Sequence, residues 1–383
     1  MNAAARASEH AGAPAGSPAV TLLWLESTRE GVAARTHLDG TRARLASAGI
    51  PIAEVITAET SVGGILGKLR RLGGLVRRAR RAARAGGVLV GRWHPFFAFV
   101  APRWLRRGGG VVLLVQGNDE SGYEANPWLR RVPGIRRLMR RSLVDASAIL
   151  TVNAPLRDWV LAERAAEGAP AVPIAVIPQV VSRVFFEAEP IERDGEFALF
   201  FGGLALWQGI ETLLAARADA AWPAELPLVV IGDGAMADTV REAVAARGDG
   251  GIEWLGALAP AEVARYAAAA LVTLCPKSAS PSMAKVTTPM KILESVAAGT
   301  PVIATDIPAQ AEMLRDGYGI LVGVDDHVAL ARAVARVHAD RDLRAELAAA
   351  AARARAALEV DGAASLLAMM IVDVASGRSA ESR

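Results

Sequence analysis

The sequence of 383 residues predicts an α/β protein built from two doubly wound domains. Short apolar runs alternate with segments of helical periodicity along most of the chain, an alternation typical of parallel sheets covered by helices. A polar break at residues 187–196 separates two such series. The chain is also longer than the roughly 250–300 residues at which single hydrophobic cores stop growing. Two domains in one chain are therefore expected.

The first domain is expected over residues 19–187. It opens as strand, polar turn with Gly31, helix and second strand, and then continues in the same alternation. Its candidate strands are residues 20–25, 50–56, 87–90, 111–115, 148–152 and 174–177. Residues 1–18 contain no Leu, Ile or Phe, so they lack the apolar core of a secretory signal and are expected to form a flexible tail.

The second domain is expected over residues 197–360, after a linker at 188–196. Its candidate strands are residues 197–201, 227–231, 251–254, 271–275, 301–304 and 320–322. Residues 361–383 have no strand after them and are expected to form a helical tail that crosses back to the first domain. The chain has one cysteine, Cys275, which excludes a disulfide framework. Because Cys275 lies in an apolar run, it is interpreted as a small buried hydrophobe.

The net charge of +3 conceals an asymmetry between the two halves. Residues 1–190 hold 26 Lys and Arg against 15 Asp and Glu, a net charge of +11, and the remaining residues hold 17 against 25, a net charge of −8. No segment reaches the ~20 apolar residues that span a bilayer. We expect a cytoplasmic protein whose two halves face different partners.

Two basic amphipathic helices account for the positive charge of the first half. In residues 65–84 and 134–143, apolar side chains form one stripe and arginines lie away from it. The arginines singled out are Arg70, Arg77, Arg81, Arg136, Arg137 and Arg140. They favour contact with the anionic inner face of a membrane or with a lipid phosphate; the competing interpretation is a solvated helix face. Nucleic acid is not expected, because no aromatic residues alternate with the arginines.

A short helix in the second half is the most informative segment for chemistry. Thr288 is suited to an N-cap, Pro289 to the first helical position and Gly299 to the C-terminal stop. The N-terminus of such a helix, preceded by Thr287, presents free N–H groups and partial positive charge to an anion such as a diphosphate.

Lys291 and Glu294 stand three residues apart on this helix, so they occupy neighbouring positions on one face. A carboxylate one turn beyond a phosphate site can accept hydrogen bonds from both hydroxyls of a ribose. The competing interpretation is an exposed Lys–Glu pair on an amphipathic helix.

Several segments occur in an order that resembles the family 4 retaining glycosyltransferases. Residues 289–303 resemble the donor-site signature of that family, in which a helix ending in small residues and Gly leads into a Pro-Val strand. The other matching segments are 200–204, 207–210, 231–234, 254–256 and the helix around Tyr266 that leads to 271–276. The resemblance covers nearly all of residues 197–350 and, more faintly, the first half.

The resemblance implies the GT-B fold, with two Rossmann-like domains facing each other across a cleft. It implies transfer of a sugar, with retention and without a bound metal or other cofactor, from a UDP- or GDP-linked sugar to a glycan or lipid-linked acceptor. Glu294 then matches the ribose-binding glutamate, Gly202 and Gly203 the phosphate turn, and Gly31 the first-domain glycine. The remaining donor-site candidates are Gln208, Gly234, Thr287 and Thr288.

The sequence also departs from the family pattern at several positions. The family commonly has Arg and Lys at the positions of Gly203 and Gln208, a glutamate at Val286 and a first-domain histidine at Gln116. Because positioned cations usually stabilise a leaving diphosphate, Lys285, Lys291 and Lys277 are candidate replacements. Lys285 and Lys291, with Glu294, are the predicted catalytic residues.

The departures leave a second hypothesis open, a GT-B-shaped binding protein or partner subunit without transferase activity. A third is an NAD-dependent enzyme, because the glycines at 232 and 234, with Glu253 about 20 residues further on, formally match a dinucleotide-binding fingerprint. Against the NAD hypothesis, the preceding strand is the second of its domain and not the first.

Polar residues follow two strands of the first domain. His94 comes after one predicted strand, and Gln116, Asn118 and Asp119 come after another. Strand ends are where α/β proteins place ligand contacts, so these side chains are candidates for the acceptor site. Structural roles, a histidine under an aromatic cluster and ordinary loop capping, compete with that interpretation.

Overall fold

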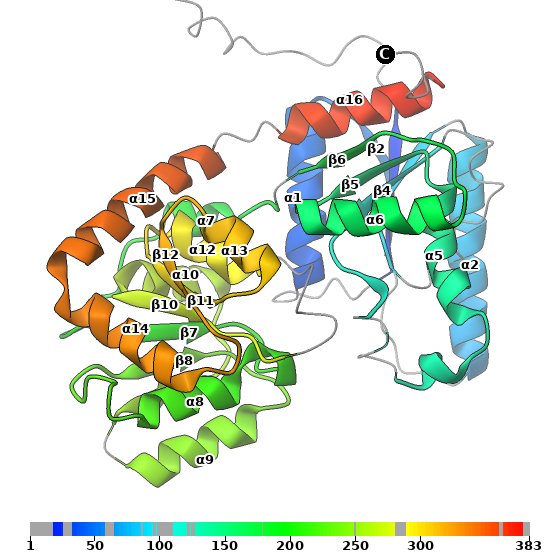
Figure 1. Ribbon diagram of the computed structural model, residues 1–383. Coiled ribbons are helices and arrows are strands. Elements are labelled where there is room, and N and C mark those ends of the chain that lie inside the picture. Colours follow the sequence, from blue (N-terminus) through cyan, green and yellow to red (C-terminus); the bar gives the residue numbers. More distant parts are fainter. Residues whose placement is uncertain are drawn as a thin grey trace, which may run out of the picture. The chain divides into compact units, whose positions relative to one another are not determined.

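The computed structural model describes residues 18–25, 33–57, 65–85, 87–94, 97, 110–120, 123, 127–177, 179–248, 250–279, 289–359 and 363–377. The chain forms two compact units (Figure 1). The first contains Met1–Val180 together with Asp361–Arg383, and the second contains Val181–Val360.

The first unit is built on a parallel six-stranded sheet of order β2-β1-β3-β4-β5-β6. Its strands are β1 (Val20–Trp24), β2 (Ile52–Thr57), β3 (Val88–Arg92), β4 (Val111–Val115), β5 (Ala148–Thr151) and β6 (Ile174–Val176). Each strand coincides with one predicted from an apolar run. The strand order reverses beside β1, which is the doubly wound arrangement expected from the sequence.

The helices of the first unit include the C-terminal one. They are α1 (Ala33–Ser47), α2 (Ile65–Arg84), η2 (Pro127–Arg131), α5 (Ile135–Asp145), α6 (Ala154–Ala166) and α16 (Ala363–Ala375). Leu367, Met370 and Ile371 of α16 are buried in the core formed with β1, β3, β4 and β5, and α16 packs against α1 (Figure 1). The apolar residues of the last helix therefore complete the first hydrophobic core.

The second unit has a parallel six-stranded sheet of order β12-β11-β10-β7-β8-β9. Its strands are β7 (Ala198–Phe201), β8 (Leu228–Ile231), β9 (Ile252–Trp254), β10 (Val272–Cys275), β11 (Val302–Thr305) and β12 (Gly319–Val322). Its helices are α7 (Arg183–Phe186), η3 (Leu206–Gln208), α8 (Ile210–Ala218), α9 (Ala237–Arg247), α10 (Pro260–Ala269), α12 (Met290–Ala297), α13 (Pro308–Leu314), α14 (His327–Ala339) and α15 (Arg341–Glu359).

Helices cover both faces of the second sheet, and the alternation along its strands shows how. On β7, Phe200 belongs to the core cluster that includes α8 and α14, whereas Leu199 and Phe201 belong to the cluster that includes α7 and α10. Successive side chains of a strand point to opposite faces, so a strand buried on both sides is apolar throughout. The prediction of two parallel α/β units is confirmed.

The division between the units lies at Val180, before the predicted linker at 188–196. Residues of that segment are bound to the second unit: the backbone N–H of Ile191 donates to the Arg265 carbonyl at 3.3 Å, and Arg193 donates twice to Glu253, at 2.9 and 2.5 Å. Part of the predicted linker is therefore held to the second sheet, through the ion pair between Arg193 and Glu253.

Candidate functional site

The candidate site lies at the carboxyl ends of β7, β8 and β10 in the second unit. Two turns interlock there: Gly202 donates its N–H to the Ile231 carbonyl and Leu204 donates to the Asp233 carbonyl, both at 2.9 Å. Gly232 has φ of 146°, and a Cβ on it would lie 1.9 Å from the Gly202 carbonyl oxygen. The two turns are in contact because this position is glycine.

Helix α12 begins one residue later than predicted. Pro289 has φ of −71° and ψ of 121° and is the N-cap, so the first helical residue is Met290. Gly299 has φ of 85° just after the C-cap, as expected for a helix stop. The predicted residues Gly31, Lys285, Val286, Thr287 and Thr288 lie outside the described residues.

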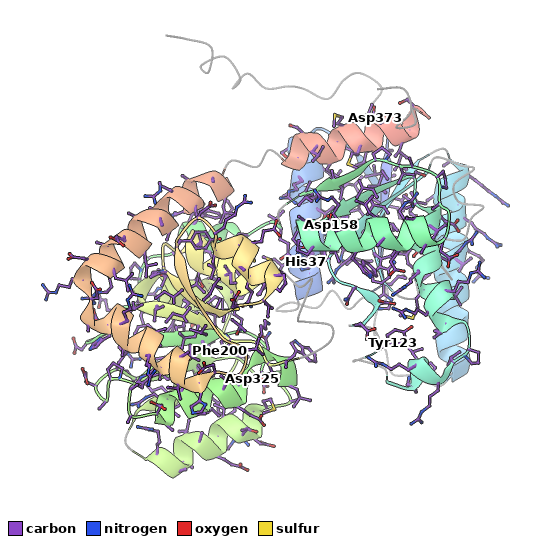
Figure 2. The ribbon with its side chains drawn as sticks, viewed as in Figure 1. His37, Tyr123, Asp158, Phe200, Asp325 and Asp373 are labelled. Atoms are coloured by element: carbon purple, nitrogen blue, oxygen red, sulfur yellow. The ribbon has the colours of Figure 1, made fainter. Side chains whose placement is uncertain are left out.

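Lys291, in the first turn of α12, is buried under the turn that follows β7. Its ammonium lies 3.7 Å from the centre of the Phe200 ring and 3.5 Å from the position that a Cβ on Gly202 would occupy. Phe200 lies on β7 (Figure 2). It has no hydrogen-bond partner within the described part of the chain. Burial lowers the pKa of Lys291 to about 7.

Lys277 follows β10 and is also buried, with 4% of its surface exposed. Its ammonium donates to Oε1 of Gln208 at 2.6 Å, and its backbone N–H donates to the Thr305 hydroxyl at 2.8 Å. Burial lowers the pKa of Lys277. The charge of Lys277 also lowers the pKa of Lys291, so the two lysines act on the same small region.

Gly209 brings the β10 loop against the β7 turn. It has φ of 67°, and a Cβ on it would lie 2.9 Å from Cβ of Pro276 and 3.1 Å from the backbone nitrogen of Lys277. A further hydrogen bond joins the Ser278 N–H to the Trp207 carbonyl at 3.3 Å. The loop that carries Lys277 is therefore fixed beside Gln208.

Glu294 lies one turn after Lys291 and is partly exposed. Burial of its carboxyl raises its pKa to about 7, and the charge of Lys291 opposes that rise. Within the described part of the chain the two side chains form no ion pair, so they are not the exposed Lys–Glu pair of the competing interpretation. Glu294 remains a hydrogen-bond acceptor at the surface of the site.

The positive charges of two buried lysines at one sheet edge require a compensating negative charge. Buried charges in proteins are normally paired, because removing an ion from water is costly. Among the described residues, neither lysine contacts a carboxylate: Lys277 reaches a neutral amide and Lys291 an aromatic ring. Within the described part of the chain, the site can therefore receive an anion without displacing an internal carboxylate.

Comparison with known proteins shows what kind of domain carries this site. Residues 196–340 match the family described as Glycosyl transferases group 1. The second unit is a group 1 glycosyl transferase domain. The resemblance drawn from the sequence, and with it the prediction of a glycosyltransferase, is confirmed.

Solved structures share the fold of both units. Sucrose-phosphate synthase from Thermosynechococcus elongatus is 18% identical, with a TM-score of 0.71 over 94% of this chain and 100% of that one. HepE from Anabaena, in complex with UDP and glucose, is 17% identical, with a TM-score of 0.65 over 93% and 99%. The lipopolysaccharide outer core galactosyltransferase WaaB is 14% identical, with a TM-score of 0.61 over 94% and 99%. No curated protein matches the chain by sequence.

Gln208, where the chain departs from the group 1 pattern, contacts a lysine. Where the family commonly has a cation, this chain has a glutamine whose Oε1 accepts from the Lys277 ammonium. A Cβ on Gly203 would meet nothing within 4 Å, so this position is open. Of the three candidate cations, Lys291 lies beside Gly202 and Lys277 contacts Gln208, whereas Lys285 lies outside the described residues.

The residues that match the NAD fingerprint make contacts within this domain. A Cβ on Gly234 would lie 2.6 Å from the Leu204 carbonyl oxygen, so this glycine serves the packing of the two turns. Glu253, the candidate for a cofactor ribose, is bound by Arg193. The structure thus uses both features of the fingerprint for folding.

The first-unit candidates have different environments. Burial, and then the charge of Arg92, lower the pKa of His94 to about 4, so its imidazole is neutral at physiological pH. Asp119 is 1% exposed and accepts from Arg140 at 2.8 Å, which gives it a structural role. Asn118 is also buried, whereas Gln116 lines a cavity.

Arg140 is not part of an exposed basic face. Its side chain is 15% exposed and pairs with both Asp119 and Glu163. The side chains of Arg136 and Arg137 are 62% and 75% exposed, and Arg77 and Arg81 are also exposed. The side chain of Arg70 lies outside the described residues.

The described residues contain neither a metal-ligand cluster nor a membrane-spanning helix. No group of three His, Cys, Asp or Glu in that part of the chain could hold a metal ion. No helix there is both long and apolar enough to cross a bilayer.

Proposed function

We propose that the protein transfers a sugar, with retention of configuration, from a UDP-linked donor to a glycan or lipid-linked acceptor. The observation that carries this proposal is the pair of buried lysines, Lys291 beside Gly202 and Lys277 beside Gln208. A diphosphate would supply an anionic partner for these two ammonium groups. The complexes of HepE with UDP and with UDP-glucose favour uridine among the bases.

In this proposal the two lysines stabilise the charge that develops on the leaving diphosphate. Lys291 acts directly, beside the backbone of Gly202. Lys277 acts through Gln208: because Oε1 accepts from the lysine, the amide nitrogen of Gln208 is left to donate to a phosphate oxygen. The N-terminal N–H groups of α12 add partial positive charge.

Glu294 holds the ribose in this proposal. As a carboxylate it accepts hydrogen bonds from two vicinal hydroxyls, and such charge-assisted bonds are stronger than neutral ones. Its pKa is about 7, and hydrogen bonds donated by the ribose hydroxyls favour the ionised form. The donor is therefore held by its phosphates and its ribose on one face of α12.

The hypothesis of a binding protein without transferase activity makes a different prediction. The full chain is incubated with UDP-glucose, UDP-galactose or GDP-mannose and a membrane extract, and UDP or GDP release is measured beside donor affinity. We expect extract-dependent release from a UDP-sugar. Binding without release would favour the inactive protein, and absence of nucleotide binding would contradict both hypotheses.

We further propose that the first unit binds an anionic membrane surface near η2 and α5. Trp128 is 57% exposed and Val132 is 37% exposed, and the exposed Arg136 and Arg137 lie close by in the sequence. Tryptophan partitions to lipid headgroups, and each basic residue near an anionic surface adds about 1 kcal/mol.

This surface is tested by cosedimentation with vesicles of phosphatidylcholine and phosphatidylglycerol at low and high salt. Trp128→Ala is expected to lower the bound fraction at least threefold. Leu206→Ala, which removes an apolar side chain of the second unit that is 69% exposed, is the control and should bind normally. Equal binding of both variants would contradict the proposal.

A further inference from the structure

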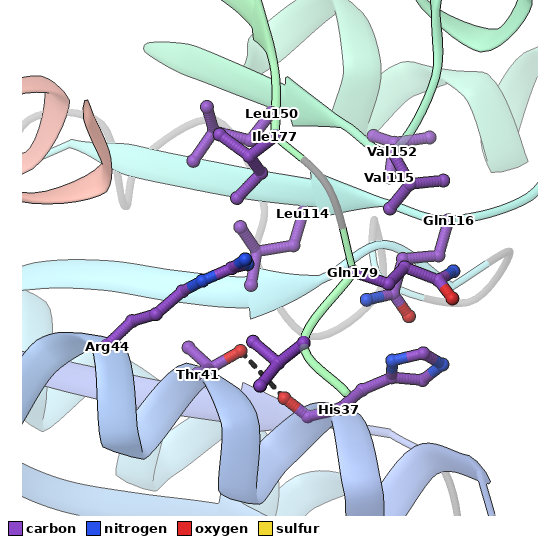
Figure 3. Close-up of a pocket in the computed structure, with 11 residues that line it drawn as sticks. His37, Thr41, Arg44, Leu114, Val115, Gln116, Leu150, Val152, Ile177 and Gln179 are labelled. Atoms are coloured by element: carbon purple, nitrogen blue, oxygen red, sulfur yellow. Dashed lines mark hydrogen bonds between the residues drawn. The ribbon is translucent and has the colours of Figure 1, made fainter. Parts of the chain in front are cut away.

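A groove runs along one edge of the second sheet, between β12 and α14. Its volume is about 490 Å³, whereas the cavity that Gln116 lines in the first unit (Figure 3) contains about 20 Å³, roughly the space of one water molecule. The apolar lining of the groove includes Val322 of β12 and Val328, Ala329 and Ala333 of α14. A groove of this size and lining can take up side chains of a partner protein.

β12 is an edge strand without the usual protection against further pairing. Edge strands normally carry a charged residue or a proline, which discourages contact with another strand. The other edge strands of the two sheets have one or the other: Glu54 lies in β2, Glu253 lies in β9, and Pro173 directly precedes β6. The sequence of β12 is Gly-Ile-Leu-Val, with no charge and no proline, and Leu321 is 37% exposed.

The backbone of β12 presents hydrogen-bonding groups to this edge. On the inner side, the Tyr318 carbonyl accepts from the Val302 N–H at 3.3 Å. The Val322 carbonyl accepts from the Asp306 N–H at 2.7 Å. Because the backbone groups of successive strand residues point alternately to the two sides of the strand, the N–H and carbonyl of Leu321 point away from β11. They face the edge at which a further strand can pair.

Charges of opposite sign lie at the two ends of the groove. Asp326 is the N-cap of α14, and Arg336 lies in its last turn; both line the groove, as does Arg332, and all three are exposed. Within the described part of the chain, neither arginine forms an ion pair with a carboxylate. A twofold axis through the groove brings the Arg336 end of one copy to the Asp326 end of another. The edge is therefore complementary to itself, as a twofold interface requires.

We propose that β12 pairs antiparallel with β12 of a second copy of this chain, so that the two six-stranded sheets continue into each other. Leu321 exchanges both backbone hydrogen bonds with Leu321 of the second copy. Arg336 of each copy pairs with Asp326 of the other. An acidic peptide from an unrelated protein fits less well, because it would compensate the arginines but would repel Asp326.

The test is sedimentation velocity of the full chain over a range of micromolar concentrations. We expect a species of twice the chain's mass that dissociates on dilution. Leu321→Pro removes only the N–H that faces the open edge, a position at which strands tolerate proline, and should raise the dissociation constant of the dimer at least tenfold. Arg336→Glu places a like charge opposite Asp326 and should have the same effect. Leu206→Ala, at an exposed apolar residue elsewhere in the second unit, is the control and should dimerise normally.

Exchange of charges tests the contact itself. Asp326→Arg alone should be monomeric, because it places a positive charge opposite Arg336. An equimolar mixture of Asp326→Arg and Arg336→Glu should form dimers, because both contacts across the twofold axis then join opposite charges. Melting temperatures show which variants are folded, since Asp326 also caps α14. If Leu321→Pro unfolds, Arg336→Glu and the mixture decide the outcome.

A monomeric unmodified chain would overturn the inference, and so would a dimer that survives both Leu321→Pro and Arg336→Glu. The unmodified chain is also titrated with a hexapeptide of alternating glutamate and valine. A monomer that binds this peptide, with affinity lost in Leu321→Pro, would assign the edge to an acidic partner and not to a second copy.

Discussion

Replacing Lys291 by methionine is expected to weaken UDP binding about 100-fold. The substitution removes the ammonium that lies beside the Gly202 turn, and a hydrogen bond to a charged group contributes about 1.5–3 kcal/mol, with about 1.4 kcal/mol per factor of ten. Isothermal titration of UDP and of inorganic pyrophosphate measures the effect. Both ligands should lose affinity, because both bind through phosphate oxygens.

The same substitution is expected to stabilise the unliganded protein. Lys291 has a pKa of about 7 in the folded protein against 10.5 as its ordinary value, so the unfolded chain binds more protons between these pH values. Stability of the unmodified protein therefore rises with pH across that window. The gain in melting temperature from Lys291→Met should be largest at pH 7 and below, and should vanish towards pH 10.5. A lower melting temperature at pH 7 would contradict the account of this lysine.

Removing the Glu294 carboxylate is expected to weaken UDP binding at least about 100-fold while pyrophosphate binding stays within twofold. The difference arises because Glu294 is assigned to ribose hydroxyls, through charge-assisted bonds worth about 1.5–3 kcal/mol each, and not to phosphate. Glu294→Ala and Glu294→Gln are titrated with both ligands. The glutamine variant should fall between alanine and the unmodified protein, since an amide oxygen still accepts.

A parallel loss of both ligands in Glu294→Ala would show that the carboxylate supports the helix or Lys291 instead of the ribose. A melting temperature measured on the same samples separates that case from partial unfolding. Full UDP affinity in the alanine variant would move the ribose site away from α12.

The strands could be predicted from the sequence because parallel strands covered on both faces are apolar throughout. Each of the twelve apolar runs became one strand. The unit boundary was harder to predict. Polar residues at 188–196 have the composition of a linker, and only the structure shows that Arg193 is paired with Glu253, sixty positions away.

The candidate site was predictable in part. The helix stop at Gly299 and the burial of Phe200 follow from local rules, and Lys291 was a candidate because it lies at a helix N-terminus. The contact between Lys277 and Gln208 joins loops after β10 and β7, which are neighbours only through the strand order.

The central claim is that Lys277 and Lys291 together form the diphosphate site of the second unit. It is tested most directly by titrating UDP into the full chain and into the double variant Lys277→Met/Lys291→Met, with melting temperatures recorded for both. We expect the unmodified protein to bind UDP, and the double variant to be folded and to show no measurable binding. A folded double variant whose UDP affinity stays within threefold of the unmodified protein would contradict the claim.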